Sequence, residues 1–208
     1  MEIEVYNISG KKTTKKVALN KAIFGVEPND HAIYLDVKQH LANKRQGTHK
    51  AKERGEIKGS TRKIKKQKGT GTARAGSIKN PLFKGGGRVF GPKPRNYGFK
   101  LNRKLKQLAR KSALSYKVSG KEMLVLENFT LDAPSTKKYV EVLNNLKVNE
   151  AKTLLVLAED NKNVYLSSRN IGNAKVLTVS ELNTYEILKA NKIMFVEDAI
   201  KTLETTLS

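Results

Sequence analysis

Residues 69–77, Gly-Thr-Gly-Thr-Ala-Arg-Ala-Gly-Ser, are the stretch that comes closest to a phosphate-binding loop. Such a loop needs two glycines separated by four residues and followed by Lys and then Ser or Thr, so that backbone amides and one ammonium group surround the phosphates. Gly71 and Gly76 have this spacing, but Ser77 occupies the lysine position. A dinucleotide fingerprint fails as well, because Arg74 stands where its third glycine is required. The spacing argues against a nucleotide site of either type.

The titratable residues indicate no catalytic or metal centre. His31, His40 and His49 are nine residues apart, which does not stack them on one helical face, and the chain has no cysteine. The acidic pairs at 159–160 and 197–198 follow apolar runs, where loop or N-cap roles are the ordinary ones. No nucleophile, base and orienting group can be assembled from such residues. We therefore expect no catalytic residue, no metal ligand, no cofactor and no enzyme activity.

The net charge of +22 is concentrated in one internal block. Residues 44–111 hold 23 Lys or Arg and two acids, Glu53 and Glu56, whereas the other 140 residues hold 18 bases and 17 acids. The block also contains 11 of the 15 glycines, among them Gly69, Gly71, Gly76 and the run 85–87. Within it, residues 63–80 have only two large apolar side chains, Ile64 and Ile78, too few to offset the entropy of ordering this stretch by burial. Cations that neutralise phosphates, beside glycines that allow close backbone approach, predict nucleic-acid binding.

RNA is favoured over DNA as the partner of this block. No helix-turn-helix, zinc-finger or basic-zipper pattern is present to set a helix into a major groove. A long irregular segment suits a folded RNA, which is recognised by shape, phosphates and unstacked bases. Three alternatives stay open: a solvated charge run, a regulator or chaperone of free RNA, and an enzyme of phosphate chemistry. The sparse apolar residues able to stack on bases or fill gaps are Ile57, Ile64, Ile78, Leu82, Phe83, Phe90, Tyr97 and Phe99.

The segments that flank the block have the patterns of helices and strands. Alternation predicts a half-buried strand over residues 1–5, and residues 16–19 would pair with it. Two helices are expected next to the block, near 30–44, where Asn29 and Asp30 offer N-caps, and near 101–118. In the first of them Ile33, Tyr34, Val37 and Leu41 share one face, which needs a packing partner; in the second Arg103, Lys106, Arg110 and Lys117 lie on a different side from the apolar stripe.

After residue 120 the apolar runs are short and nearly continuous. Such runs predict strands covered on both faces, hence a parallel sheet, at 123–129, 153–159, 175–179 and 192–196. Helices are expected between and after them, at 135–147, 184–190 and 198–206. The fold class is therefore α/β: a three-layer α/β/α body with a mainly parallel sheet, formed by residues 1–46 and 99–208. Residues 47–98 would be a long extended basic loop inserted between two helices.

The sequence also bears on the compartment. The opening Met-Glu-Ile-Glu-Val-Tyr carries acids where a signal peptide has bases, and the longest apolar runs are too short to span a bilayer. The lack of cysteine is compatible with a reducing compartment. We expect a cytoplasmic protein without a membrane partner.

Three stretches carry a specific resemblance to a known family: Arg-Gln-Gly-Thr-His-Lys at 45–50, the segment 67–79 and the segment 85–115. They closely resemble the bacterial form of ribosomal large-subunit protein four, and residues 24–29 agree. The resemblance covers the whole chain and is most specific over 45–115. It implies an α/β/α body that sits against 23S rRNA, and a long loop that reaches the wall of the peptide exit tunnel. There the loop forms a constriction with protein twenty-two and meets the nascent peptide.

The resemblance and the charged block together give the residues expected to act in the large subunit. Those expected to contact RNA are Lys44, Arg45, Gln46, Thr48, Lys50, Lys52, Arg54, Arg62, Lys63, Lys65, Lys66, Lys68, Arg74, Lys79, Lys84, Arg88, Lys93, Arg95, Arg103, Lys106 and Arg110. The resemblance implies a tunnel-facing tip of Lys65, Lys66, Gln67, Lys68, Gly69, Thr70, Gly71 and Thr72. Family members typically have Pro-Trp at the positions of Ile64 and Lys65, and Arg at that of Thr72. Some members also repress their own operon by binding its messenger.

Overall fold

The structure is a computed structural model that describes residues 1–207. Its Cα positions divide the chain into two units: Met1–Leu41 together with the chain from Lys100 onward, and Ala42–Phe99. The strands and helices lie in the first unit, apart from the last residues of α2 (Asp30–Lys44), which belong to the second. The two units are described separately below.

The first unit is built on a six-stranded sheet with the order β2-β1-β3-β6-β4-β5. Every neighbouring pair is parallel except β1 and β2, which run antiparallel. The strands are β1 (Glu2–Tyr6), β2 (Lys12–Ala18), β3 (Met123–Leu126), β4 (Thr153–Leu157), β5 (Ala174–Thr178) and β6 (Lys192–Val196). The strands that the sequence predicts as a parallel sheet are confirmed.

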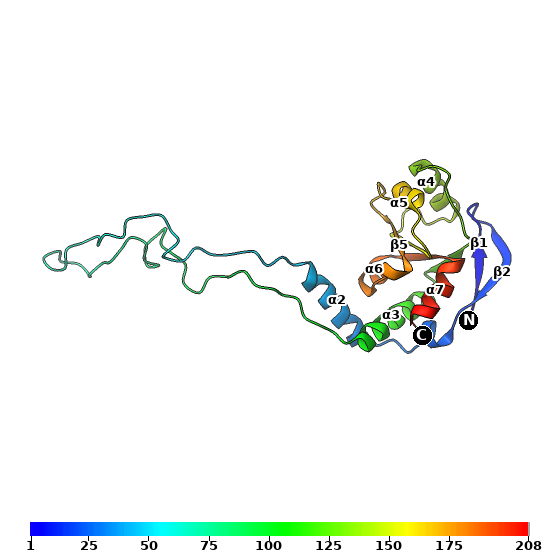
Figure 1. The fold of residues 1–208 in the computed structure, drawn as a ribbon, viewed down its shortest axis with the longest axis horizontal. Helices are drawn as coiled ribbons and strands as arrows, with labels where there is room; N and C mark the ends of the chain where they lie inside the picture. The colour runs from blue at the N-terminus through cyan, green and yellow to red at the C-terminus, as the bar shows by residue number, and fades with distance from the viewer. Residues whose placement is uncertain (208) are drawn as a thin grey trace. The chain divides into compact units, whose positions relative to one another are not determined.

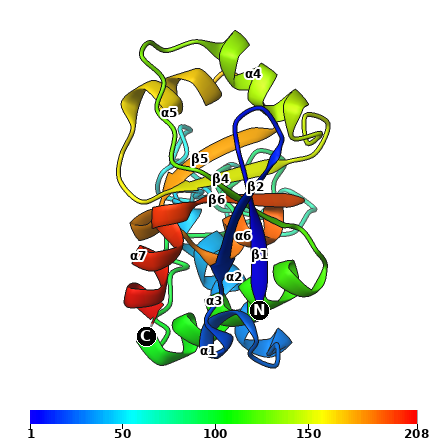
Figure 2. The ribbon, with the colours of Figure 1, turned by 90° about the vertical axis from the view of Figure 1, so that its right-hand side faces the viewer.

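Helices cover both faces of this sheet, which confirms the predicted α/β class. Figures 1 and 2 show α4 and α5 on one face and α3, α6 and α7 on the other. Besides α2, the helices are α1 (Lys21–Phe24), α3 (Arg103–Ser119), α4 (Thr136–Asn145), α5 (Lys162–Ser168), α6 (Thr184–Lys189) and α7 (Glu197–Leu207), with a 3-10 turn, η1 (Val179–Glu181). The sequence did not predict α1 or α5, which are only four and seven residues long.

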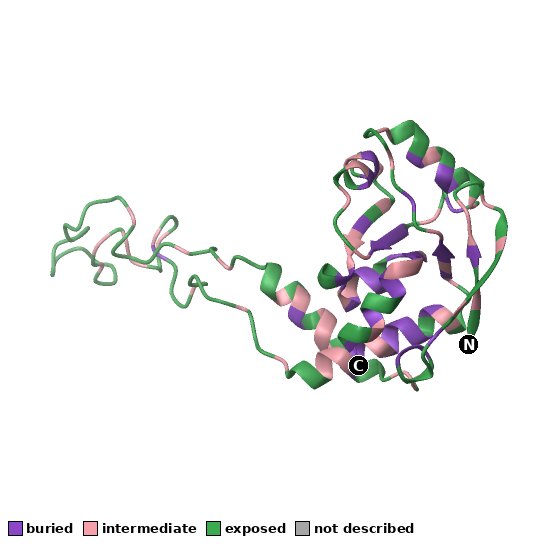
Figure 3. Ribbon diagram, turned by 45° about the vertical axis from the view of Figure 1, so that its right-hand side comes forward, coloured by how far each residue is buried: buried purple, intermediate pink, exposed green. Residues whose placement is uncertain are grey.

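The hydrophobic core is the reason why the strands after residue 120 read as continuous apolar runs. All five residues of β4 are buried, because helices pack on both sides of this central strand. Every buried residue of the main core cluster lies in the first unit. Figure 3 shows the same division: buried segments in the helices and strands, and an almost wholly exposed or half-buried chain from 45 to 102. The first unit therefore holds the burial that stabilises a fold.

Helix α2 packs differently from the sequence prediction. Ile33 is buried, but Tyr34 and Leu41 are 56% and 46% exposed, so the expected apolar face of the helix is wrong for these two residues. Polar contacts take part of their place, because Thr184 Oγ1 donates to Asp36 Oδ2 at 2.5 Å. The predicted N-cap is confirmed, since Asn29 Oδ1 accepts from the backbone N–H of Ala32 at 2.9 Å.

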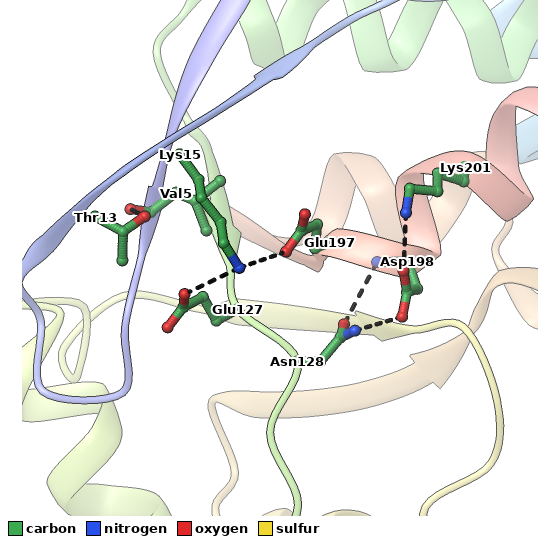
Figure 4. A network of polar contacts seen from close by, with 8 residues as sticks. All are labelled: Val5, Thr13, Lys15, Glu127, Asn128, Glu197, Asp198 and Lys201. Carbon is green, nitrogen blue, oxygen red and sulfur yellow. Dashed lines mark hydrogen bonds and ion pairs between the residues drawn. The ribbon is translucent and has the colours of Figure 1, made fainter.

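The acids at the carboxyl ends of the strands have structural partners, as Figure 4 shows. Lys15 Nζ lies 3.5 Å from Glu127 and 3.9 Å from Glu197, and so connects β2 to the ends of β3 and β6. The Asn128 amide donates to Asp198, which lies in the first turn of α7 and also pairs with Lys201. The hydrogen bond from Asn128, followed by that from Lys201, lowers the pKa of Asp198. The predicted loop or N-cap role of residues 197–198 is wrong in position, because both lie in the first turn of α7, where acids suit the amino end of a helix.

Candidate nucleic-acid interface

The second unit presents nearly all its cationic side chains to solvent. Residues 45–102, all described, form turns, bends and irregular chain without a helix or a strand. Of the predicted RNA-contacting residues between Lys44 and Arg95, all are exposed except the half-buried Lys79. The eight residues of the predicted tip, 65–72, are exposed without exception. The unit thus has the solvent-accessible cations that phosphate contacts require.

The segment doubles back on itself through a few backbone hydrogen bonds between a first limb, residues 47–64, and a second limb, residues 76–95. The bonded pairs are Arg95 N to Gly47 O at 3.1 Å, Ala51 N to Pro92 O at 3.0 Å, Arg88 N to Lys52 O at 2.9 Å and Ile64 N to Gly76 O at 3.0 Å. The hydroxyl of Ser77 adds a bond to the Ser60 carbonyl at 2.9 Å. Most other backbone groups of the limbs have no such cross-limb partner.

The glycines of the segment fall into two kinds. A Cβ on Gly47, whose φ is +66°, would lie 2.0 Å from the Arg95 carbonyl oxygen, and one on Gly87 would lie 2.3 Å from the Arg54 backbone nitrogen. These glycines let the two limbs approach each other. From the sequence, Gly87 and its neighbours 85–86 are expected to let phosphates approach the backbone closely. The structure adds a second reason for a glycine at 87, namely its contact with the other limb. By contrast, a Cβ on Gly76 would meet nothing within 4 Å.

Tyr97 organises the arginines where the limbs begin and end. The guanidinium carbon of Arg45 lies 3.7 Å from the centroid of the Tyr97 ring, and that of Arg95 lies 4.6 Å from it. The Tyr97 hydroxyl is 3.0 Å from His49 Nε2. The sequence predicts only that the Tyr97 ring could stack on RNA bases or fill gaps between elements. Here it orients two of the predicted RNA-contacting residues by cation–π contact.

Both acids of the segment pair with lysines. Lys50 donates to Glu56, and Lys93 Nζ lies 2.9 Å from Glu53. The Lys50 hydrogen bond, followed by that of the Glu53 backbone N–H, lowers the pKa of Glu56, and the hydrogen bond to Glu53 raises the pKa of Lys93. Both shifts favour the charged forms at neutral pH. Lys50 and Lys93 are thus partly neutralised within the chain, unlike the cations of the tip.

The three predicted RNA-contacting residues of α3 belong to the first unit and are less uniform. Arg103 is exposed at the start of the helix, whereas Lys106 and Arg110 are half-buried. The Nε atom of Arg110 is buried without a hydrogen-bond partner among the described residues. Lys117 is buried; its Nζ donates to Glu122 at 2.6 Å and to the Ala190 carbonyl at 2.7 Å. It therefore supports the fold from inside and is not part of a surface.

Residues 1–207 offer neither a metal centre nor a membrane-spanning helix. These residues contain no group of three or more His, Cys, Asp or Glu side chains that could hold a metal ion. None of their helices is long and apolar enough to cross a membrane.

These features define a basic two-unit α/β protein in which practically all the excess charge lies in one glycine-rich internal segment. The chain belongs to the ribosomal protein L4/L1 family, whose family model matches residues 17–206. It is 64% identical over 208 residues to the large ribosomal subunit protein uL4 of Christiangramia forsetii, with all of both chains covered. It is 60% identical to the proteins of the same name from Flavobacterium psychrophilum and Bacteroides fragilis, again over the full length of both chains.

Two of the three positions at which this chain departs from the family pattern, Lys65 and Thr72, are in contact with each other. Lys65 Nζ donates to Thr72 Oγ1 at 2.8 Å across the tip. The family resemblance puts an aromatic ring and an arginine at these two positions.

The two kinds of glycine predict opposite results of substitution by alanine. In Gly47→Ala, the left-handed φ and the contact with the Arg95 carbonyl should cost about 1–3 kcal/mol of local strain. The amide of Arg95, which donates to Gly47, should then exchange its hydrogen at least about tenfold faster. Gly76→Ala is the matched control and should leave that rate unchanged. Equal rates in the two variants, measured by NMR on the full chain, would contradict the close approach of the limbs.

Proposed function

We propose that this chain is a structural constituent of the large ribosomal subunit that binds 23S rRNA through its α/β body and through residues 47–98. The proposal assigns no catalytic step and no cofactor. It is supported by family membership and by relatives that carry the name of a large-subunit protein along their full length. The observation that carries it is the segregation of charge: 23 bases against two acids in residues 44–111.

The physical case rests on what this segment lacks. It contributes no residue to the core cluster, and its two acids neutralise only Lys50 and Lys93. The remaining cations repel one another, so the limbs gain order when phosphates lie between and around them. Release of counterions from the RNA then supplies the free energy of binding. The segment acts as the long RNA-penetrating loop of the protein, and its conformation depends on the surrounding rRNA.

The tip is proposed to line the peptide exit tunnel. Residues 65–72 are exposed and carry three lysines without an acid, and two of them, Lys66 and Lys68, have no carboxylate partner among the described residues. In this role the tip lies beside protein twenty-two at the constriction and meets the nascent peptide in passing. This part of the proposal derives from the family resemblance of residues 67–79.

A second role in repressing its own operon is proposed on the same resemblance, with messenger RNA bound through the body. The body can be tested for this role by itself, since the core cluster contains no residue of the second unit. Messenger binding that persists after removal of residues 60–80 supports this role, and its loss with the segment contradicts it.

Deletion of residues 60–80, with a short Gly-Ser bridge in their place, tests RNA binding by the segment. The wild-type affinity for a 23S rRNA transcript should fall about 10³–10⁵-fold between 50 and 200 mM salt, as for roughly six to ten phosphate contacts. The deletion removes seven Lys or Arg, so the slope of log affinity against log salt should become shallower by several units. The melting temperature of the body should stay within a few degrees of that of the wild type, which corresponds to a change of about 1 kcal/mol or less in the free energy of unfolding. An unchanged salt slope would refute the role of the segment.

Charge reversal at the tip tests the tunnel assignment. Lys66→Glu and Lys68→Glu should alter macrolide sensitivity or the passage of nascent chains, because the tunnel wall loses a cation and gains an anion at the constriction. Lys58→Glu, an exposed change of equal charge in the first limb, is the control and should not do so. Folding should be unaffected, since these side chains are exposed. Drug response and elongation that match the control in both tip variants would remove the tunnel from the proposal.

A further inference from the structure

The parallel strands of the first unit are ordered by charge along their direction. Lys121 and Lys152 precede β3 and β4, and β6 begins with Lys192. The acids come after the same three strands, at Glu127, at 159–160 and at 197–198. Since parallel strands start at one edge of a sheet and end at the other, these lysines lie at the amino edge, together with Glu122 and Glu150, and the acids named above lie at the carboxyl edge. This unit carries a net charge of +7, from 24 Lys or Arg and 17 acids, and the order of these charges along the strands adds an asymmetry across the sheet.

Contacts within the sheet show that these lysines lie at the starts of neighbouring strands. Lys192 Nζ donates to the Lys121 carbonyl at 3.0 Å, and Lys192 is the register partner of Thr153 in β4. Thr153 is in turn the partner of Ala174, the first residue of β5. The starts of four neighbouring strands therefore lie side by side at this edge.

A pocket of about 230 Å³ opens at this edge beside β4 and β5. Four cations line it, Lys152, Arg169, Lys175 and Lys189, together with one acid, Glu186. Glu186 is committed to Lys175, whose Nζ lies 2.6 Å from its carboxylate. The other three cations have no carboxylate of the described residues within ion-pair distance. The wall of the pocket therefore keeps about three uncompensated positive charges, which favour an anionic occupant.

Polar groups that lack partners line the same pocket. Thr153 is only 3% exposed, and its hydroxyl oxygen has no hydrogen-bond partner among the described residues. The backbone N–H groups of Gly172 and Asn173, also in the lining, donate to no backbone carbonyl. A buried hydroxyl and free amides are the donors that phosphate oxygens accept. The volume lies below the roughly 300–1,000 Å³ of sites for drug-sized molecules, so it suits one phosphate group.

The opposite edge of the sheet has no such character. A hollow of about 690 Å³ there is lined by Glu159, Asp160 and Asp198, whose charge repels phosphate. The usual ligand edge of an open parallel sheet, its carboxyl edge, is therefore the wrong one for RNA in this protein. A competing reading of the basic pocket is that Arg169 and Lys189 only stabilise the carboxyl ends of α5 and α6. If so, removal of these two cations lowers the stability of the protein but not its affinity for RNA, and an experiment can therefore distinguish the two interpretations.

We propose that the amino edge of the parallel strands is the surface through which the first unit binds RNA, and that the pocket between Lys152, Arg169 and Lys189 holds one backbone phosphate. This inference rests on the proposed function and adds to it the face of the body that meets the RNA. None of these residues belongs to the RNA-contacting set that the sequence predicts.

The test is the double variant Arg169→Ala/Lys189→Ala in the full chain, with Lys137→Ala/Lys138→Ala as a control of equal charge on exposed positions of α4. Binding to a 23S rRNA transcript is measured over a range of salt. The pocket variant should bind more weakly than the control, with a salt slope shallower by about one unit relative to it. A pocket variant that binds like the control, with or without a lower melting temperature, overturns the inference and leaves the proposed function standing. A wild-type chain that does not bind the transcript overturns both.

Titration with inorganic phosphate identifies the source of the anion. The NMR signals of the Gly172 and Asn173 amides should shift with phosphate in the wild-type chain and in the control variant but not in the pocket variant. The transcript should displace the phosphate. Phosphate binding that the transcript does not displace would assign the pocket to a free phosphate compound and refute the RNA contact. No shift with either probe would refute an anion site.

Discussion

Repulsion among cations that the chain cannot neutralise internally is the constraint from which the architecture follows. Residues 44–111 carry a net charge of +21, from 23 bases and two acids, and the acids form exposed pairs with Lys50 and Lys93. Exposed pairs of this kind contribute little to stability. The cross-limb backbone hydrogen bonds are few, and the main core cluster contains no residue between 45 and 102. We infer that the order of this part of the segment depends on a polyanion.

The first unit, by contrast, is stabilised by its own hydrophobic core. Its central strand β4 is buried along its whole length, and helices cover both faces of the sheet. Its 24 bases exceed its 17 acids by seven, and the charged residues that flank the parallel strands differ between the two edges of the sheet. The acids are held in structural contacts such as those of Glu127 and Asp198 (Figure 4). A stable body can in this way present a chosen face to RNA while the long segment supplies most of the cationic contacts.

Much of this architecture could be predicted from the sequence, because apolar runs indicate buried strands and the positions of Lys and Arg show where the charge lies. Continuous apolar runs gave β3 to β6, and Asn29 identified the start of α2. Tyr34 and Leu41 were misassigned, since helical spacing does not reveal that Asp36 and Thr184 make the contact instead. Helix α5 was missed because seven residues give too short a periodic signal.

Contacts between distant residues were beyond the reach of sequence patterns. The stacking of Arg45 on Tyr97, the approach of Gly87 to Arg54 and the hydrogen bond between Lys65 and Thr72 depend on how the limbs pair. The basic pocket likewise joins residues 152, 169 and 189, which only the parallel register brings together. The composition of the segment indicated RNA, whereas the face of the body that meets RNA required the fold.

Hydrogen exchange of residues 60–80 in the purified full chain, with and without a 23S rRNA transcript, tests the central claim most directly. The account predicts that these amides exchange at nearly the rate of an unfolded peptide in the free protein and slow markedly when the RNA is bound. The amides of β4 should be protected in both states and serve as the internal reference. Protection of residues 60–80 in the absence of RNA would show that the segment orders itself, and would contradict the account.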